Sequence, residues 1–105
     1  MRLEETFGKL RRRFVERAAK RIANLHGLAV RLPRGNVDPL SLNTLFIHAH
    51  GLVGTAATFG FQGLSVAAQR LANAIHDKIQ SRSTISREAR DKLVKSIDAL
   101  QEMAA

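Results

Sequence analysis

The fold is decided between residues 40 and 60, where the chain reads LSLNTLFIHAHGLVGTAATFG. Apolar residues recur in this stretch in steps of three and four, which places them on one face of an α-helix. This seam consists of Leu42, Leu45, Ala49, Leu52, Ala56 and Phe59. Asp38 suits the N-cap of such a helix, Pro39 its first position and Gly60 its end. We therefore predict a helix over residues 39–59 with one buried face.

Three further segments show the same periodicity, and we predict helices over about residues 3–32, 62–81 and 86–104. Their apolar stripes are, in chain order, Leu3, Phe7, Leu10, Phe14, Ala18, Ile22, Leu25, Ala29 and Leu32; Leu64, Ala68, Leu71, Ile75 and Ile79; and Leu93, Ile97, Leu100 and Ala104. A helix with a single apolar stripe must bury that stripe against other elements. Four such helices joined by short loops favour an all-α fold, an antiparallel up-down four-helix bundle that occupies residues 1–105 as one domain.

Composition narrows the class of protein. The 105 residues include no cysteine, which excludes disulfides and thiolate metal sites. No apolar run approaches the roughly 20 residues that span a bilayer, and residues 1–5 do not resemble a secretory signal, so we expect a cytoplasmic protein without membrane contact. The 17 basic and 9 acidic residues give a net charge of +8, which attracts nucleic acid, a lipid surface or an acidic protein pocket.

Two histidines flank the buried seam of the helix predicted over residues 39–59. With Ala49 at the centre of the seam, His50 lies about 100° to one side and His48 about 100° to the other, so the two cannot bind one metal ion together and we predict no metal site. The residues beside His50 are Phe46, Val53, Gly54 and Ala57. Glycine inside a helix costs roughly 1 kcal/mol relative to alanine, which indicates a compensating role. Gly54 lies one turn after His50, where a missing side chain leaves room for a partner to approach the imidazole.

A neutral imidazole is a good phosphate acceptor, because one ring nitrogen is nucleophilic near neutral pH while a hydrogen bond can hold the other. The stretch from His50 to Gly60, HGLVGTAATFG, resembles the signature of histidine-containing phosphotransfer domains. That signature reads His, any residue, a hydrophobic residue, Lys, Gly, two small residues, two further positions, a hydrophobic residue and Gly. Residues 64–71, LSVAAQRL, are similar to the helix that follows in this family, and the resemblance covers residues 42–79 directly.

The resemblance implies that His50 is the phosphorylated residue and that the chain carries phosphate without a kinase activity or a cofactor of its own. It implies a histidine kinase and the receiver domains of response regulators as partners, with Mg²⁺ held by the receiver. Two positions depart from the family pattern. Val53 stands where the family usually has a lysine that steadies the phosphoryl charge, and Ala72 stands where it often has a Glu or Gln that orients the imidazole. These departures bear on how efficiently phosphate is transferred.

The third predicted helix offers substitutes for the missing groups. An antiparallel helix should bring residues 69–73 to the level of His50, because both lie about ten residues from the turn near Gly60. Three polar residues fall there: Gln69, Arg70 and Asn73. The arginine could supply charge to a phosphoryl group, and either amide could hydrogen-bond to the imidazole.

We also expect an apolar docking patch for a partner beside His50. Its members are Phe46, Val53, Ala57 and Phe61. His26 and His76 have no distinctive neighbours in the sequence, and we expect them to be solvated or partly packed. The chain is expected to act as a monomer.

The sequence leaves two other functions open. A basic helical nucleic-acid-binding module fits the isoelectric point near 11.4 and the arginine-rich first segment, although no helix-turn-helix signature and no aromatic stacking platform accompany them. A helical adaptor could use the same surface without carrying phosphate. A kinase is excluded, because the sequence has no nucleotide-binding glycine loop.

Overall fold

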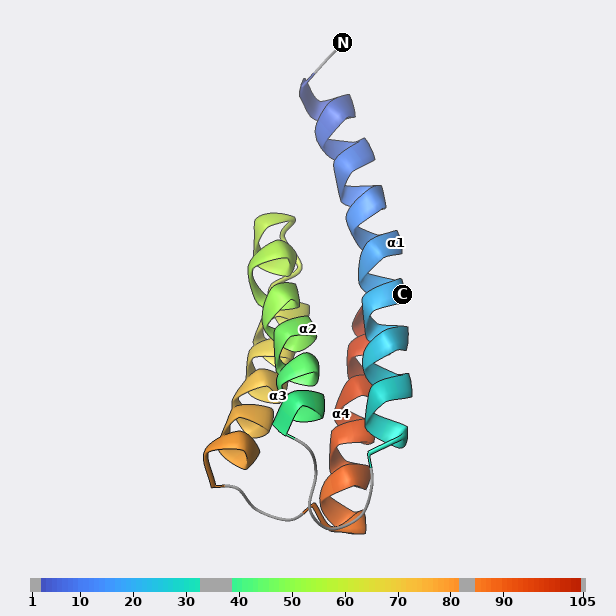
Figure 1. Ribbon diagram of the computed structural model, residues 1–105. Coiled ribbons are helices and arrows are strands. Elements are labelled where there is room, and N and C mark those ends of the chain that lie inside the picture. Colours follow the sequence, from blue (N-terminus) through green and yellow to red (C-terminus); the bar gives the residue numbers. More distant parts are fainter. Residues whose placement is uncertain (1–2, 33–38, 82–84, 105) are drawn as a thin grey trace.

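The computed structural model describes residues 3–32, 39–81 and 85–104, and Figure 1 shows them as four helices. Their bounds are α1 (Leu3–Val30), α2 (Pro39–Thr58), α3 (Gln62–Ser81) and α4 (Arg87–Ala104), each within two residues of the predicted range. The N-cap predicted for α2, Asp38, lies outside the described residues. At the start of α4 the hydroxyl of Ser86 accepts a hydrogen bond from the backbone N–H of Ala89 at 3.0 Å, which caps that helix. The predicted all-α fold is confirmed.

Consecutive helices run in opposite directions along the bundle, as the colour sequence in Figure 1 shows. α1 and α3 each contact both α2 and α4, so the four helices enclose one shared core. The connection between α2 and α3 is tight because Gly60 adopts a φ of 84°, which a residue without Cβ tolerates. There the N–H of Phe61 donates to the carbonyl of Ala56 at 2.8 Å and closes the end of α2. The arrangement is the up-down bundle that the sequence predicts.

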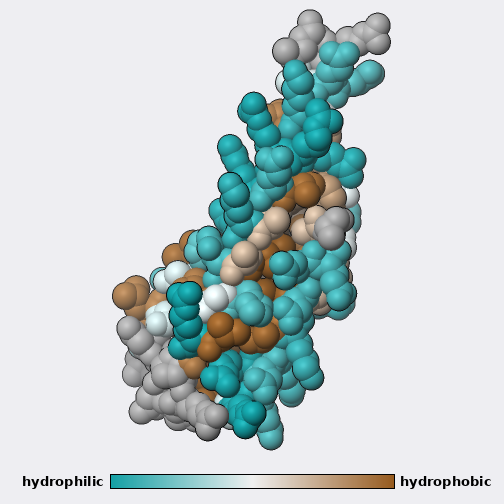
Figure 2. All heavy atoms as spheres, turned by 90° about the vertical axis from the view of Figure 1, so that its right-hand side faces the viewer, coloured by the Kyte–Doolittle hydropathy of each residue, from teal (hydrophilic) through white to brown (hydrophobic). Residues whose placement is uncertain are grey.

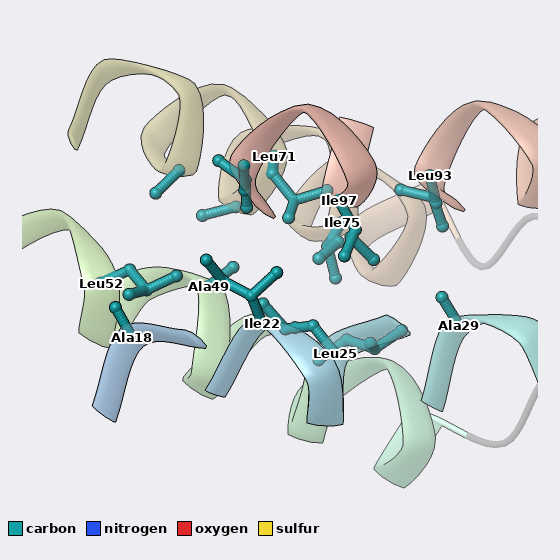
Figure 3. Close-up of a cluster of buried hydrophobic side chains, with 14 of the residues drawn as sticks. Ala18, Ile22, Leu25, Ala29, Ala49, Leu52, Leu71, Ile75, Leu93 and Ile97 are labelled. Carbon is teal, nitrogen blue, oxygen red and sulfur yellow. The ribbon is translucent and has the colours of Figure 1, made fainter. Parts of the chain in front are cut away.

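Aliphatic side chains from all four helices meet in the centre of the bundle (Figure 3). Ile22 of α1, Ile75 of α3 and Ile97 of α4 are fully buried there together with Ala49 of α2. Burying one isoleucine side chain of this kind contributes about 1.5–3 kcal/mol. The predicted seam of α2 is buried throughout except at Phe59, which is half-buried. This packing fixes the rotation of α2 and therefore the directions in which its two flanks face.

α1 projects beyond the other three helices at its N-terminal end (Figure 1). It has 28 residues and α4 has 18, a difference of about 15 Å at 1.5 Å per residue. The start of its apolar stripe is therefore exposed, with Leu3 84%, Phe7 46% and Leu10 43% accessible. Figure 2 shows hydrophobic surface between hydrophilic side chains along this part of the molecule. The expectation that the whole stripe is buried is wrong for these three residues, because α4 ends before it reaches their level.

Candidate functional site

His50 lies on an exposed flank of α2, beside the buried seam. Its ring stacks on the phenyl ring of Phe46, one helical turn earlier, with the centroids 5.4 Å apart and the planes inclined by 14°. Among the described residues the imidazole has no hydrogen-bond partner. The stack orients the plane of the ring, while both nitrogens stay available to water or to a partner. The predicted exposure of His50 is confirmed.

The space one turn beyond His50 is open. Gly54 is exposed, and a Cβ built on it would meet no atom within 4 Å. Packing inside the described chain therefore gives no reason for a glycine at this position. The open space remains on the solvent side, where a molecule that approaches the imidazole would need it.

Two contacts set the register of α3 against the His50 flank of α2. The buried hydroxyl of Ser65 donates to the backbone carbonyl of Val53 at 2.7 Å. Three turns along α3, the ring of His76 lies 5.7 Å from the ring of Phe46, measured between centroids. His50 lies between Val53 and Phe46 along α2, so the part of α3 at its level lies between Ser65 and His76. The expectation that residues 69–73 lie at this level agrees with both contacts.

The family model of the Hpt domain matches residues 9–103 of the chain. The chain belongs to the Hpt family. Hpt domains are phosphocarrier modules that act with histidine kinases and receiver domains in two-component phosphorelays, and they are not themselves kinases. None of the curated proteins compared with the chain matches it. The histidine phosphotransfer role follows from membership of the family, whereas the role of each residue rests on the geometry of the site.

In this Hpt domain the two residues that depart from the family pattern, Val53 and Ala72, are apolar and also lie in apolar surroundings. Val53 is half-buried and packs against the core. Ala72 is fully buried in α3. Neither position can donate a hydrogen bond from its side chain or place a charge beside the imidazole of His50.

The polar residues expected on α3 divide into two groups. Gln69 follows Ser65 by four residues, so it lies on the flank that faces α2, and its Nε2 donates to Oδ1 of Asn73 at 2.9 Å. These two amides pair with each other, and neither is bonded to His50. Arg70 is exposed and lies about 140° around the helix from Ser65, at roughly 100° per residue. The structure therefore brings Gln69 toward the His50 flank and leaves Arg70 on another side of α3.

His76 is exposed, which agrees with the expectation of a solvated or partly packed residue. Sequence reasoning missed the contact that its ring makes with Phe46, on which His50 also stacks. His76 follows Ser65 by eleven residues, which is about 20° around the helix and so on the same row of α3. The register argument that led to residues 69–73 would have found it if extended by one turn.

The expected docking residues also separate. Phe46 and Val53 are half-buried and Ala57 is exposed, all on α2. Phe61 lies in the turn after α2, where its ring is 5.4 Å from that of Phe14 and the guanidinium of Arg11 sits 4.7 Å above it. Phe61 thus packs toward α1 and does not line the flank of His50. α2 nevertheless adds no carboxylate, lysine or arginine to the surface around His50.

No group of three or more metal-ligating side chains occurs among residues 3–32, 39–81 and 85–104. No helix within the same ranges is long and apolar enough to cross a membrane.

Proposed function

We propose that this Hpt domain relays a phosphoryl group through His50, between a histidine kinase or receiver domain on one side and a response regulator on the other. The observation that carries the proposal is the environment of His50. Its exposed ring is stacked on Phe46, free of hydrogen bonds to the described residues, and next to the open space at Gly54. These features suit a nucleophile that a partner's active site must enclose.

The chemistry requires little from the domain itself. A neutral nitrogen of His50 attacks the phosphorus of an aspartyl phosphate on the receiver; the P–N bond forms as the P–O bond breaks, and the electron pair leaves with the receiver's carboxylate. The other ring nitrogen keeps its proton, so the phosphorylated ring carries a positive charge. In the onward step a carboxylate oxygen of the second receiver attacks the phosphorus, and the imidazole leaves as a neutral ring. Mg²⁺ is expected on the receiver, where it would neutralise phosphoryl charge.

The uncharged face of α2 supports a close approach by the partner. Ile47 is 59% exposed, and the positions beside His50 are half-buried Val53 and exposed Gly54 and Ala57. A receiver that covers this face desolvates no charged side chain of α2, which lowers the cost of association. Attraction at longer range comes from the net charge of +8.

The experiment is phosphoryl transfer from receiver domains charged with acetyl phosphate. We expect acid-labile label on the wild type and on His48→Gln, and none on His50→Gln. His48→Gln is the matched control, because it removes an imidazole from the same helix on the other flank. Label that persists in His50→Gln would exclude His50 as the acceptor.

An interaction-only adaptor is the second candidate, and the apolar side chains of Val53 and Ala72 favour it. This candidate predicts that receiver domains bind the wild type while no label is transferred. The same experiment separates the two, because binding and labelling are measured on one mixture.

A further inference from the structure

A groove runs between α1 and α2 on the flank of α2 that faces away from His50. It has a volume of about 210 Å³, and its apolar floor includes Phe14, Leu52 and Phe59. Two residues line it from α2: Leu52 belongs to the buried seam, and Thr55 lies on the opposite side of that seam from His50. The groove and the phosphotransfer site can therefore be occupied at the same time.

One rim of the groove is a row of cations. Arg13, Arg17 and Arg21 line it from α1, each one turn after the last. Among the described residues, the one contact of 4 Å or less between a basic and an acidic side chain joins His26 to Asp98 at 3.6 Å, so no carboxylate in those ranges forms an ion pair with this row. The guanidinium of Arg21 lies over Gly51 of α2, in the space that a Cβ there would occupy. The row thus faces a helix without charged residues and has no internal counterion in the described chain.

The apolar floor continues along the projecting part of α1. Leu10 lines the groove, and Phe7 and Leu3 extend the same stripe with 46% and 84% of their surface exposed. The ring of Phe7 lies 5.6 Å from that of Phe59, which joins this stripe to the floor. From Leu3 to Leu10 the exposed part of the strip is about 10 Å long, or two helical turns, and it leads into the groove. A row of exposed apolar side chains that is bordered by charge is typical of a protein interaction site.

We propose that this groove docks an acidic amphipathic helix of a partner protein. The partner's apolar face would lie on half-buried Phe59 and on exposed Phe7 and Leu10, and its carboxylates, spaced by four residues, would pair with the arginine row. Charge selects this occupant over a second copy of the chain. The basic residues of α1 between residues 9 and 21 are Lys9, Arg11, Arg12, Arg13, Arg17, Lys20 and Arg21, with Glu16 as the only acidic one. Two such surfaces repel each other.

The test uses the full chain and a synthetic probe. The probe is a peptide of about 18 residues, or five helical turns, built from alanine, leucine and glutamate. Its leucines recur in steps of three and four on one face, with glutamates four residues apart beside them. A scrambled peptide of the same composition has the same charge and no apolar face. We expect the ordered peptide to bind at least about tenfold more tightly than the scrambled one.

Two triple variants locate the binding. Exchanging Arg13, Arg17 and Arg21 for glutamine should weaken binding of the ordered peptide about tenfold or more. The control exchanges three cations outside the groove for glutamine and lowers the net charge equally; these are Arg70, Arg87 and Lys95, and binding should fall by less than about threefold. Leu10→Gln tests the floor at a position 43% exposed, where the fold tolerates a polar side chain, and should also weaken binding.

Backbone amide shifts on titration should map to Leu52 and Thr55 and not to Gly54. His50→Gln should bind the peptide as the wild type does, which keeps this proposal separate from the proposed function. Equal binding of the scrambled peptide, or equal loss in both triple variants, would overturn the proposal. So would self-association that the groove variant abolishes, since the occupant would then be a second copy. Binding to vesicles with about one-quarter phosphatidylserine in place of the peptide would assign the surface to lipid instead.

Discussion

Gly54 offers a perturbation with opposite effects on stability and on function. In the helix interior an alanine is more favourable than a glycine by about 0.8–1 kcal/mol. A methyl group at Gly54 would meet no atom within 4 Å, so no steric cost offsets this gain. We therefore expect Gly54→Ala to favour the folded state about fivefold and to raise the thermal midpoint by about 4–8 °C. Circular dichroism during heating or urea titration measures the change.

A larger side chain at the same position should block transfer without unfolding the domain. In a helix, leucine points back toward the preceding turn, which here is the turn that carries His50. Gly54→Leu should therefore fold at least as well as the wild type and lose phosphoryl transfer by about tenfold or more, since a receiver cannot close over the imidazole. Transfer rates are measured from the label on the domain as a function of time.

Gly27→Ala is the matched control. A Cβ there meets only the guanidinium of Arg31, at an ordinary contact distance of 3.7 Å, and the residue belongs to α1. This variant should gain similar stability and transfer phosphate at the wild-type rate. The reasoning fails if Gly54→Ala lowers the midpoint, or if a folded Gly54→Leu variant transfers as fast as the wild type.

Three further predictions concern the contacts around His50. Ser65→Ala removes the buried hydrogen bond to the carbonyl of Val53 and should lower the free energy of unfolding by about 1 kcal/mol in urea titrations; an unchanged value would contradict the role given to this bond. Val53→Lys restores the family's cation at a half-buried position, and labelling should become several times faster, whereas an unchanged rate would show that charge there is immaterial. Phe46→Ala removes the ring on which the imidazole stacks, and transfer should fall about three- to tenfold more than in Phe46→Tyr, which keeps the stack; equal rates in the two variants would refute the orienting role of Phe46.

The helices could be predicted from the sequence because local signals fix them. The seam through Ala49 repeats in steps of three and four, and Pro39 and Gly60 mark its ends, so predicted and observed bounds differ by no more than two residues. The exposure of His50 could be predicted from the same periodicity, because His50 lies about 100° around the helix from the seam. The prediction that the apolar start of α1 is buried was wrong, because the burial of Leu3 depends on how far α4 extends along α1, which no local signal in the sequence reveals.

To predict which residues of α3 lie beside His50, one must know how α3 is rotated about its own axis as well as which residues lie at the same level. Equal distances from the turn placed residues 69–73 at the height of His50, but they do not determine which side of α3 faces α2. The Ser65 hydrogen bond to Val53 supplies that rotation, which turns Arg70 away and brings His76 to Phe46. Phe61 could not be placed from the sequence either, because the left-handed backbone at Gly60 redirects the chain toward α1.

The most direct measurement is the location of the phosphoryl group after transfer, by fragmenting the intact labelled domain under alkaline conditions in a mass spectrometer. If an exposed, stacked imidazole with open space beside it is the carrier, the added phosphate mass will be found on His50 alone. Phosphate on His48 or His76, or an unmodified domain after exposure to several charged receivers, would contradict the account.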